Sequence, residues 1–164
     1  MDARRIVVLG AGNILLTDEG LGIRALQALE SRYTFPENVS LMDGGTLGLS
    51  LLACICEADD LIVLDAIKNN GAPGDLYRIC GEEIPKRIRA KNSIHQVDFL
   101  ETLAVATALD QAPQTVILGL EPQDIQSVSL ELSPEISKKL PRLVEMAVAE
   151  LARLGVAVME KQEE

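Results

Sequence analysis

The chain has 164 residues, with 25 acidic and 15 basic side chains, one histidine, three cysteines and 48% hydrophobic residues. A chain of this length can bury roughly 70% of its unfolded surface around one core. We therefore expect a single domain over residues 1–159, followed by a frayed polar tail over residues 160–164. The net charge of -10 repels phosphate backbones, and aromatic residues make up only 2% of the chain, so we expect no nucleic-acid partner.

The single histidine, His95, excludes several kinds of site. Zincin helices, tri-histidine zinc centres and C2H2 fingers all need at least two histidines. No G-x-S-x-G sequence is present, and Cys54 and Cys56 lie in an apolar segment, where a thiol more often packs than attacks. The odd cysteine count predicts a reducing compartment, which we take to be the cytoplasm. No apolar stretch reaches the ~18 residues of a membrane span, so we expect no membrane insertion.

Four short apolar runs alternate with segments of helical periodicity, which is typical of an α/β protein. Their β-branched residues and lack of alternation predict strands that are covered on both faces of a mostly parallel sheet. The four runs are residues 5–10, 39–43, 61–66 and 115–120. A weaker run over residues 76–80 follows the turn-rich sequence NNGAPGD and predicts an antiparallel edge strand, and residues 156–159 predict a last strand.

Four helical segments are expected between these strands, over residues 17–33, 47–58, 98–109 and 133–154. Thr17 and Asp18 are residue types that cap helices, so they are predicted to begin the first one. Pro141 is expected to divide the last segment, because proline removes a backbone donor inside a helix. Gly155 is expected to end that segment.

The turn after the first strand reads GAGNILLTDEGLG. Gly10 and Gly12 occupy the first two positions of a G-x-G-x-x-G dinucleotide motif, but Leu15 takes the third. The loop also continues to Asp18 before a helix can start cleanly. This departure disfavours a dinucleotide site, and a tight backbone bend is enough to explain the glycines.

Three side chains are candidates for chemistry. Glu19 lies in the first turn of a predicted helix, where the helix dipole alone can account for a carboxylate. Asp65 ends the most apolar strand, at the edge where open α/β sheets bind their ligands. His95 lies in a loop that enters a helix, where most histidines are structural. Because a doubly wound sheet brings its central strand ends to one crevice, we expect these three to converge into a weak site for a divalent transition metal.

A fourth segment, Asp43-Gly44-Gly45-Thr46, ends the second strand at the same edge of the sheet. Its two glycines would let backbone approach a bound chain closely. An ordinary tight turn with an aspartate cap explains the pattern equally well.

Nearly the whole chain resembles the hydrogenase maturation endopeptidases, which trim the C-terminal extension from the large subunit of nickel-iron hydrogenases. The resemblance runs through LGAGNILLTDEGLGIRALQAL, MDGGTLGLSLL, LIVLDAI, GAPGDLYR, SIHQVDFLETLAVA and ILGLEPQDI. The order and spacing of these blocks are more specific than any one block. The resemblance implies a three-layer α/β/α fold with about five strands and a site without catalytic serine, cysteine or zinc.

In that family the metal-contacting residues are the acid of the D-E-G segment, the aspartate after the third strand and the histidine of the segment read here as S-I-H-Q. They correspond to Glu19, Asp65 and His95, which the resemblance therefore implies as catalytic and metal-contacting residues. The family's substrate-selecting turn corresponds to Asp43, Gly44 and Gly45. The resemblance also implies that nickel arrives with the substrate, a nickel-iron hydrogenase large-subunit precursor, and that the protein holds no tight cofactor of its own.

The role of the metal stays open at this point. It would act as an anchor that checks the substrate, or also as a Lewis acid that polarises the scissile carbonyl or a water. Glu19 or Asp65 would be the general base if it is not committed as a ligand. Two other functions remain as alternatives. A non-enzymatic nickel carrier or chaperone would hold stoichiometric metal, and a nucleotide- or flavin-binding module would be indifferent to changes at Glu19.

Overall fold

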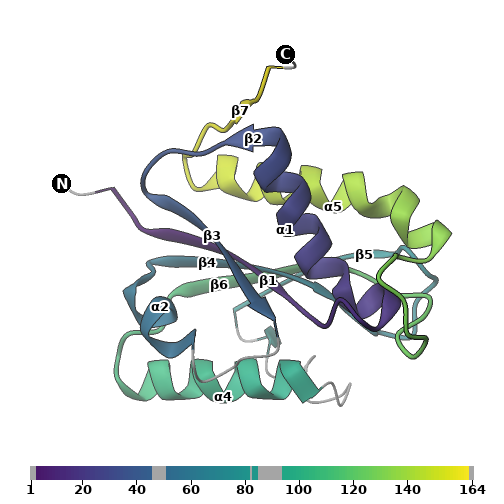
Figure 1. The fold of residues 1–164 in the computed structure, drawn as a ribbon. Coiled ribbons are helices and arrows are strands. Elements are labelled where there is room, and N and C mark those ends of the chain that lie inside the picture. The colour runs from purple at the N-terminus through teal and green to yellow at the C-terminus, as the bar shows by residue number, and fades with distance from the viewer. Residues whose placement is uncertain (1–2, 46–50, 82, 85–93, 163–164) are drawn as a thin grey trace.

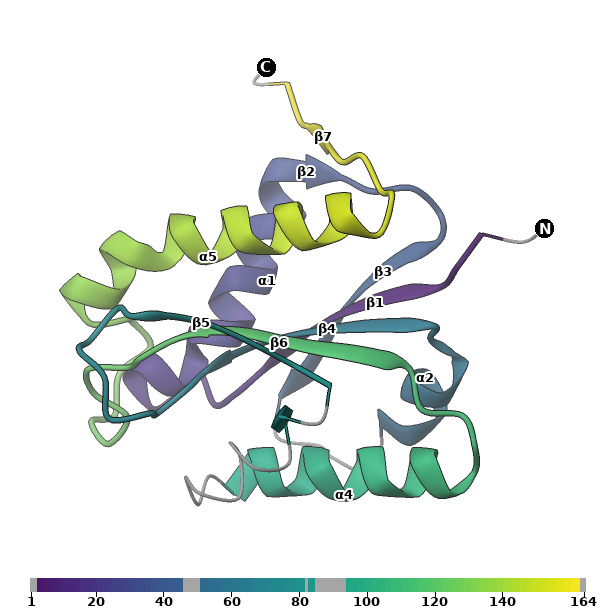
Figure 2. The same ribbon diagram turned by 180° about the vertical axis from the view of Figure 1, so that it is seen from behind.

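A computed structural model describes residues 3–45, 51–81, 83–84 and 94–162, with the backbone alone for Gly45 and residues 94–100. Within these residues, five strands form one sheet that helices cover on both faces (Figure 1). Helices α1 (Leu21–Arg32) and α5 (Pro134–Arg153) lie on one face. Helices α2 (Leu52–Glu57) and α4 (Ile94–Ala108) lie on the other, as the reverse view also shows (Figure 2). The three-layer α/β/α fold is confirmed.

The strands follow the order β3-β1-β4-β6-β5 across the sheet. Their bounds are Ile6–Ala11 for β1, Val39–Gly45 for β3, Asp60–Ala66 for β4, Leu76–Cys80 for β5 and Gln114–Leu120 for β6. Strands β3, β1, β4 and β6 pair in parallel, and β5 pairs antiparallel with β6 at the edge. The four main strands and the antiparallel edge strand therefore form as the sequence predicts.

Strands β1 and β4 are neighbours, but the chain leaves them in opposite directions. After β1 it passes through α1 to β3 on one side, and after β4 it continues to β5 at the opposite edge. In open α/β sheets the carboxyl ends of two such strands border the crevice where ligands bind. The segment over residues 12–20 follows β1, and Asp65 is the last residue but one of β4.

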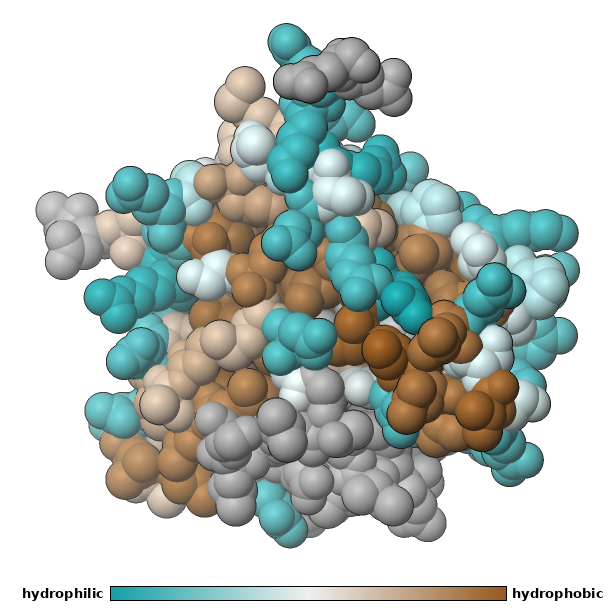
Figure 3. All heavy atoms as spheres, in the orientation of Figure 1, coloured by the Kyte–Doolittle hydropathy of each residue, from teal (hydrophilic) through white to brown (hydrophobic). Residues whose placement is uncertain are grey.

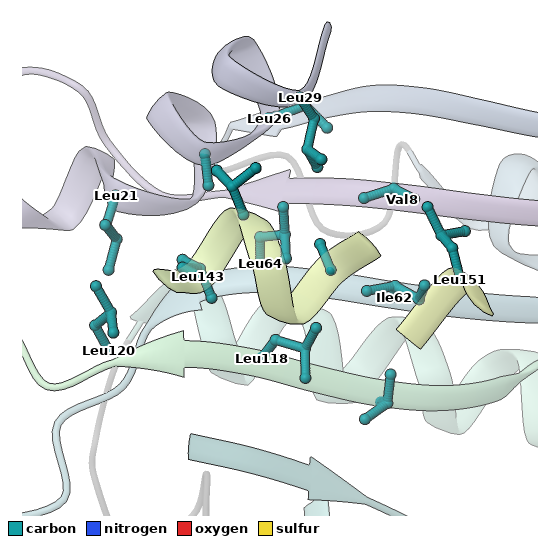
Figure 4. Close-up of a cluster of buried hydrophobic side chains, with 14 of the residues drawn as sticks. Val8, Leu21, Leu26, Leu29, Ile62, Leu64, Leu118, Leu120, Leu143 and Leu151 are labelled. Carbon is teal, nitrogen blue, oxygen red and sulfur yellow. The ribbon is translucent and has the colours of Figure 1, made fainter. Parts of the chain in front are cut away.

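Two apolar clusters bury the sheet, one on each face. In strand β4, Ile62, Leu64 and Ala66 occupy alternate positions and pack in the cluster with α1 and α5, as Figure 4 shows for Ile62 and Leu64. Leu61, Val63 and Ile67 belong to the second cluster, toward α2 and α4. Because successive strand residues point to opposite faces, Asp65 also points toward the α2 and α4 layer. Each fully buried aliphatic side chain in these clusters stabilises the fold by about 1.5–3 kcal/mol.

The first helix begins later than expected. A short 3-10 turn, η1 (Thr17–Gly20), precedes α1, and no side chain caps either element. Asp18 is fully buried and its carboxylate bonds to a distant loop instead. The cap prediction for Thr17 and Asp18 is therefore wrong.

The predicted division at Pro141 is also wrong, because Pro141 lies inside the continuous helix α5. Its side chain is exposed, while Ile136 before it and Leu143 and Val144 after it are buried in one cluster. Packing on both sides therefore keeps the helix together despite the missing backbone donor. Gly155 ends α5 with a φ of 81°, as expected.

The remaining helices and the last strand differ in their bounds. Helix α4 begins at Ile94, four residues before the predicted start, and α2 covers only Leu52–Glu57 of the predicted segment, whose residues 47–50 lie outside the described part. The last strand, β7 (Met159–Glu160), pairs with β2 (Tyr33–Thr34) in a separate small sheet. Lys161 then donates its backbone N–H to the Arg32 oxygen at 2.8 Å, so the chain is held beyond residue 159. Among the helices described, none has both the length and the apolar character to cross a membrane.

Candidate functional site

Gly22 lets the first turn of α1 rest directly on the ends of β1 and β4. A Cβ at this position would overlap the backbone oxygens of Leu64 and Ala11 and would lie 2.8 Å from the Ala11 nitrogen. Only glycine therefore allows this close approach. The contact fixes the turn that precedes α1 over the boundary between the two strands.

That turn carries Glu19, whose side chain is half-buried. The Glu19 backbone N–H donates to the Leu16 oxygen at 3.1 Å, and its carbonyl accepts the Asn13 N–H at 3.1 Å. Gly12 has a φ of 130°, and a Cβ there would overlap the Glu19 carbonyl oxygen. The glycine-rich turn thus does more than bend the chain, because it wraps the backbone of Glu19. Turn η1 also packs against β4, the strand that carries Asp65.

Asp65 lies at the carboxyl end of β4, as predicted, but it is only 2% exposed. Its Oδ1 accepts the backbone N–H of Ala66 at 2.8 Å. Gly119 pairs with Asp65 in the neighbouring strand β6, and a Cβ there would overlap the Asp65 carbonyl oxygen and lie 2.7 Å from Ile67 Cδ1. Glycines therefore allow close packing on both sides of the Asp65 backbone, through Gly22 and Gly119.

His95 is the second residue of α4, and its side chain lies outside the described part of the structure. Its helix covers the face of the sheet toward which Asp65 points. Among the described side chains, which do not include that of His95, no three histidine, cysteine, aspartate or glutamate residues lie close enough to hold a metal. The metal-contacting trio of Glu19, Asp65 and His95 therefore stays a prediction.

Asp43 lies at the same edge of the sheet but belongs to the opposite face from Asp65. It is exposed and pairs in register with Gly10, whose Cβ position faces Leu26 of α1 at 3.0 Å. Gly44 points the other way, and a Cβ there would lie 2.8 Å from Leu9 Cδ1, so packing alone accounts for this glycine. The pairing shifts between Gly10 and Ala11, which brings Gly45 opposite Ala11. Thr46 lies outside the described residues.

Sequence reasoning missed Asp18 as a buried carboxylate. Its Oδ2 accepts the backbone N–H groups of Gln123 and Asp124, both at 2.9 Å, and the Ser133 hydroxyl at 2.7 Å, while Oδ1 accepts the Ser133 N–H at 2.9 Å. Asp18 therefore ties the loop over residues 121–133 to the turn that carries Glu19. An aspartate at the start of a helical pattern gives the same local signal as an ordinary cap, so no feature of the sequence distinguished it.

Glu121 is a second buried carboxylate that the sequence reasoning missed. It directly follows β6, and its carboxylate accepts the Asn69 N–H at 2.7 and 3.0 Å and the Gly71 N–H at 2.6 Å. These bonds hold the segment that follows Asp65. The rule that singled out Asp65, an acid at the carboxyl end of an apolar strand, applies to Glu121 as well and could have found it.

The loop over residues 121–133 has its own anion, Asp124. Its Oδ1 accepts the backbone N–H groups of Gln126 and Ser127, both at 2.9 Å. These hydrogen bonds lower the pKa of Asp124 below its usual value. The Ser127 hydroxyl has the largest effect, and the two backbone N–H groups add to it. The charge on this loop therefore persists under mildly acidic conditions.

The structure is that of a doubly wound α/β protein. Its candidate carboxylates lie at the ends of β1 and β4, where the chain departs in opposite directions, and its first turn lacks the glycine spacing of a dinucleotide site. The chain belongs to the hydrogenase maturation protease family, whose model matches residues 23–150. It is thus a hydrolase that acts on peptide bonds. This membership confirms the resemblance seen in the sequence and favours the peptidase over the carrier and the nucleotide-binding module.

Similar proteins extend over nearly the whole chain. The hydrogenase expression/formation protein HupD of Bradyrhizobium diazoefficiens is 40% identical over 156 residues, which cover 94% of this chain and 81% of that protein. The structure of the hydrogenase maturating endopeptidase HybD from E. coli matches with a TM-score of 0.92 at 35% identity, covering 96% of this chain and 98% of that one. The [NiFe] hydrogenase maturation protease HybD from Thermococcus kodakarensis matches with a TM-score of 0.74 at 26% identity, covering 90% and 99%.

Proposed function

We propose that this protease removes the C-terminal extension of a nickel-iron hydrogenase large-subunit precursor after nickel has been inserted. Family membership supports a hydrogenase as the substrate, and one similar structure is named as a [NiFe] hydrogenase maturation protease. The observation that carries the proposal is that the Glu19 turn and Asp65 lie at the ends of β1 and β4, the two strands from which the chain departs in opposite directions.

The proposed site recognises nickel that belongs to the substrate. Two carboxylates and one imidazole suit a divalent transition metal that keeps open positions for other ligands. Three protein ligands hold such an ion weakly, so the precursor's own ligands must complete its coordination. Glu19, Asp65 and His95 would then contact the ion only in a loaded precursor, which makes nickel insertion a condition for cleavage.

Hydrolysis also needs a group that accepts a proton from the attacking water. Within the proposed site, Glu19 and Asp65 are the carboxylates that can take this role. Asp65 is buried within a strand of the sheet, whereas Glu19 is half-buried on a short turn. This difference supports Asp65 as a fixed metal contact and Glu19 as the carboxylate that meets the water.

We assign substrate selection to Asp43, at the end of the edge strand β3. Its exposed carboxylate leaves the sheet on the side away from Asp65, so it would contact a part of the precursor outside the cleavage centre. Gly44 and Gly45 keep the chain beside it free of bulky side chains. The reaction is assigned to the cytoplasm, because all three cysteines of the chain, Cys54, Cys56 and Cys80, are free.

The test compares cleavage of nickel-loaded and nickel-free precursor by the purified protein, with the mass of the precursor as the readout. We expect only the loaded precursor to lose its extension. Equal cleavage of both would contradict nickel recognition, and no cleavage of either would contradict the proposed substrate.

Variants then test the individual residues. His95→Ala and Glu19→Gln should each abolish or strongly reduce cleavage without a change in melting temperature. Asp65→Asn keeps the shape of the buried side chain but removes its charge, so a loss of cleavage would reflect the carboxylate and not altered packing. Glu145→Gln, which alters an exposed carboxylate on α5, is the matched control and should behave as wild type. A fully active His95→Ala would remove the histidine from the site.

A further inference from the structure

Three large apolar side chains lie exposed on one part of the surface beside the Glu19 turn. They are Leu15, Val128 and Leu130, with exposed fractions of 55%, 84% and 59%. Figure 3 shows apolar surface gathered on the side of the molecule where Figure 1 places the loop over residues 121–133. Single exposed apolar residues are common, but a group of them next to a site marks a binding surface. We call these three residues the apolar patch.

Backbone pairing holds the members of the apolar patch together. Leu16 and Ser129 form a parallel bridge, in which the Ser129 N–H donates to the Leu15 oxygen at 3.0 Å and the Thr17 N–H donates to the Ser129 oxygen at 3.1 Å. Val128 and Leu130 flank Ser129, so the bridge brings them beside Leu15. In addition, the Arg24 guanidinium donates to the Leu130 oxygen at 2.6 Å.

The loop that carries the patch is fixed from beneath by Asp18. The buried carboxylate accepts four hydrogen bonds from Gln123, Asp124 and Ser133, which lie on either side of Val128 in the sequence. The Thr17 hydroxyl adds a bond to the Ser127 oxygen at 2.6 Å. A buried carboxylate with several donors holds a loop firmly. The apolar side chains are thus presented in a fixed arrangement, which lowers the entropy lost on binding.

The patch is continuous with the proposed cleavage centre. Leu15 and Glu19 belong to the same short segment, and the Glu19 N–H bonds to the carbonyl of Leu16, which forms the bridge. A precursor whose scissile bond is placed at Glu19 therefore lies close to the patch.

The charges around the patch specify the chemistry of its partner. Two acidic residues, Asp124 on the same loop and Glu131 directly after Leu130, border the patch, and the basic neighbour Arg24 has its guanidinium bonded to the Leu130 oxygen. The whole chain carries a net charge of -10. A second copy of this chain would bring acidic residues against acidic residues, which disfavours self-association. A partner with apolar residues bordered by basic side chains fits better.

We infer that the apolar patch is the docking surface for the folded body of the hydrogenase precursor, which meets it with an apolar region bordered by basic side chains. This inference rests on the proposed function and deepens it. Recognition is thereby divided between two places, because the patch binds the body of the precursor and the carboxylate site meets its nickel.

The test measures binding and cleavage of nickel-loaded precursor by Val128→Asp and by the double variant Val128→Ser/Leu130→Ser. The serine variant removes apolar surface without adding charge. Met159→Asp is the matched control, because Met159 is 71% exposed but lies on β7, away from the loop. We expect both patch variants to raise the Kd and KM roughly tenfold or more, with kcat and the melting temperature unchanged. Met159→Asp should bind as wild type.

Three outcomes would overturn the inference. If both patch variants bind and cleave the precursor as wild type does, the docking surface is wrong while the proposed function stands. If sedimentation shows a dimer of this chain that Val128→Asp dissociates, a second copy occupies the patch. If the wild-type protein neither binds nor cleaves the precursor, the proposed function fails and the docking surface fails with it.

Discussion

Replacement of Gly22 by alanine should lower stability and cleavage together. A Cβ at position 22 would overlap two backbone oxygens, those of Leu64 and Ala11, whereas an ordinary contact lies at 3.4–4 Å. Neither oxygen belongs to a flexible side chain that could turn away. The first turn of α1 must therefore move from the sheet by roughly 1 Å, and the Glu19 turn must move with it.

The magnitude follows from two opposing effects. Extra atoms in a packed interior cost about 1–3 kcal/mol, and contact with fixed backbone places this change at the upper end. Alanine recovers about 1 kcal/mol through its higher helix propensity. The net loss in the free energy of unfolding is then about 2 kcal/mol, or about 4–8 °C in melting temperature for a domain of this size. A displacement of ~1 Å in a catalytic group can reduce the rate about 100-fold.

Thermal melting and precursor cleavage measure the two effects, with Gly155→Ala as the control. Gly155 has a φ of 81°, but nothing lies within 4 Å of its Cβ position. Its replacement costs only backbone strain of about 1 kcal/mol and should leave cleavage unchanged. The reasoning would be refuted if Gly22→Ala melted at or above the wild-type temperature and cleaved the precursor at the wild-type rate.

Three further predictions follow from the buried and charged groups. Asp18→Ala leaves several donors without an acceptor and should lower the free energy of unfolding, measured in denaturant, by about 2–4 kcal/mol. Asp18→Asn keeps one oxygen acceptor and should lose less. Equal losses for the two variants would contradict the idea that the remaining oxygen still accepts part of these bonds. The lowered pKa of Asp124 means that its stabilising effect is present above the ordinary aspartate pKa and is lost as the pH falls through the lowered value. A carboxyl pKa at or above the ordinary value in an NMR titration would contradict this. Burial raises the pKa of the Cys54 thiol, and the nearby Glu57 charge raises it further. Alkylation of Cys54 at neutral pH should therefore be slow, and Cys54→Ala should cleave the precursor normally. A folded but inactive Cys54→Ala would implicate the thiol in cleavage.

The sheet could be predicted because its strands carry their own signal. Strand β4 is buried at every residue, so its sequence reads as a continuous apolar run rather than an alternating one. The antiparallel direction of β5 was also predictable, because the short turn-rich sequence before it leaves no room for a crossover helix. These features depend on local sequence and on burial, which the chain displays directly.

The hydrogen-bond partners of Asp18 and Glu121 could not be predicted in the same way, although the position of Glu121 at a strand end could. The acceptor groups of Asp18 meet donors that lie 105–115 residues further along the chain. A local rule sees only an acid at the start of a helix, and it predicts a cap. Glu121 bonds to residues about 50 positions earlier, beyond the reach of any local pattern. In both cases tertiary contacts determine what the carboxylate does.

The site itself was partly predictable. The position of Asp65 follows from the general rule for strand ends in open α/β sheets, and its placement beside the Glu19 turn follows from the order of the strands. The sequence reasoning did not separate the faces of Asp43 and Asp65. That separation depends on the register in which Asp43 pairs with Gly10, and on the contact of Gly10 with α1.

The end of β4 explains why glycines and buried acids gather at this corner. Backbone groups beyond a strand end lose their partners in the sheet and need other acceptors when they are buried. Glu121 supplies acceptors to the segment after Asp65, and Asp18 supplies them to the loop beside Glu19. Gly22 and Gly119 bring the neighbouring backbone close enough for this arrangement. These four residues therefore hold the backbone on both sides of Asp65 and beneath the turn that carries Glu19, which fixes the relative position of the two candidate carboxylates.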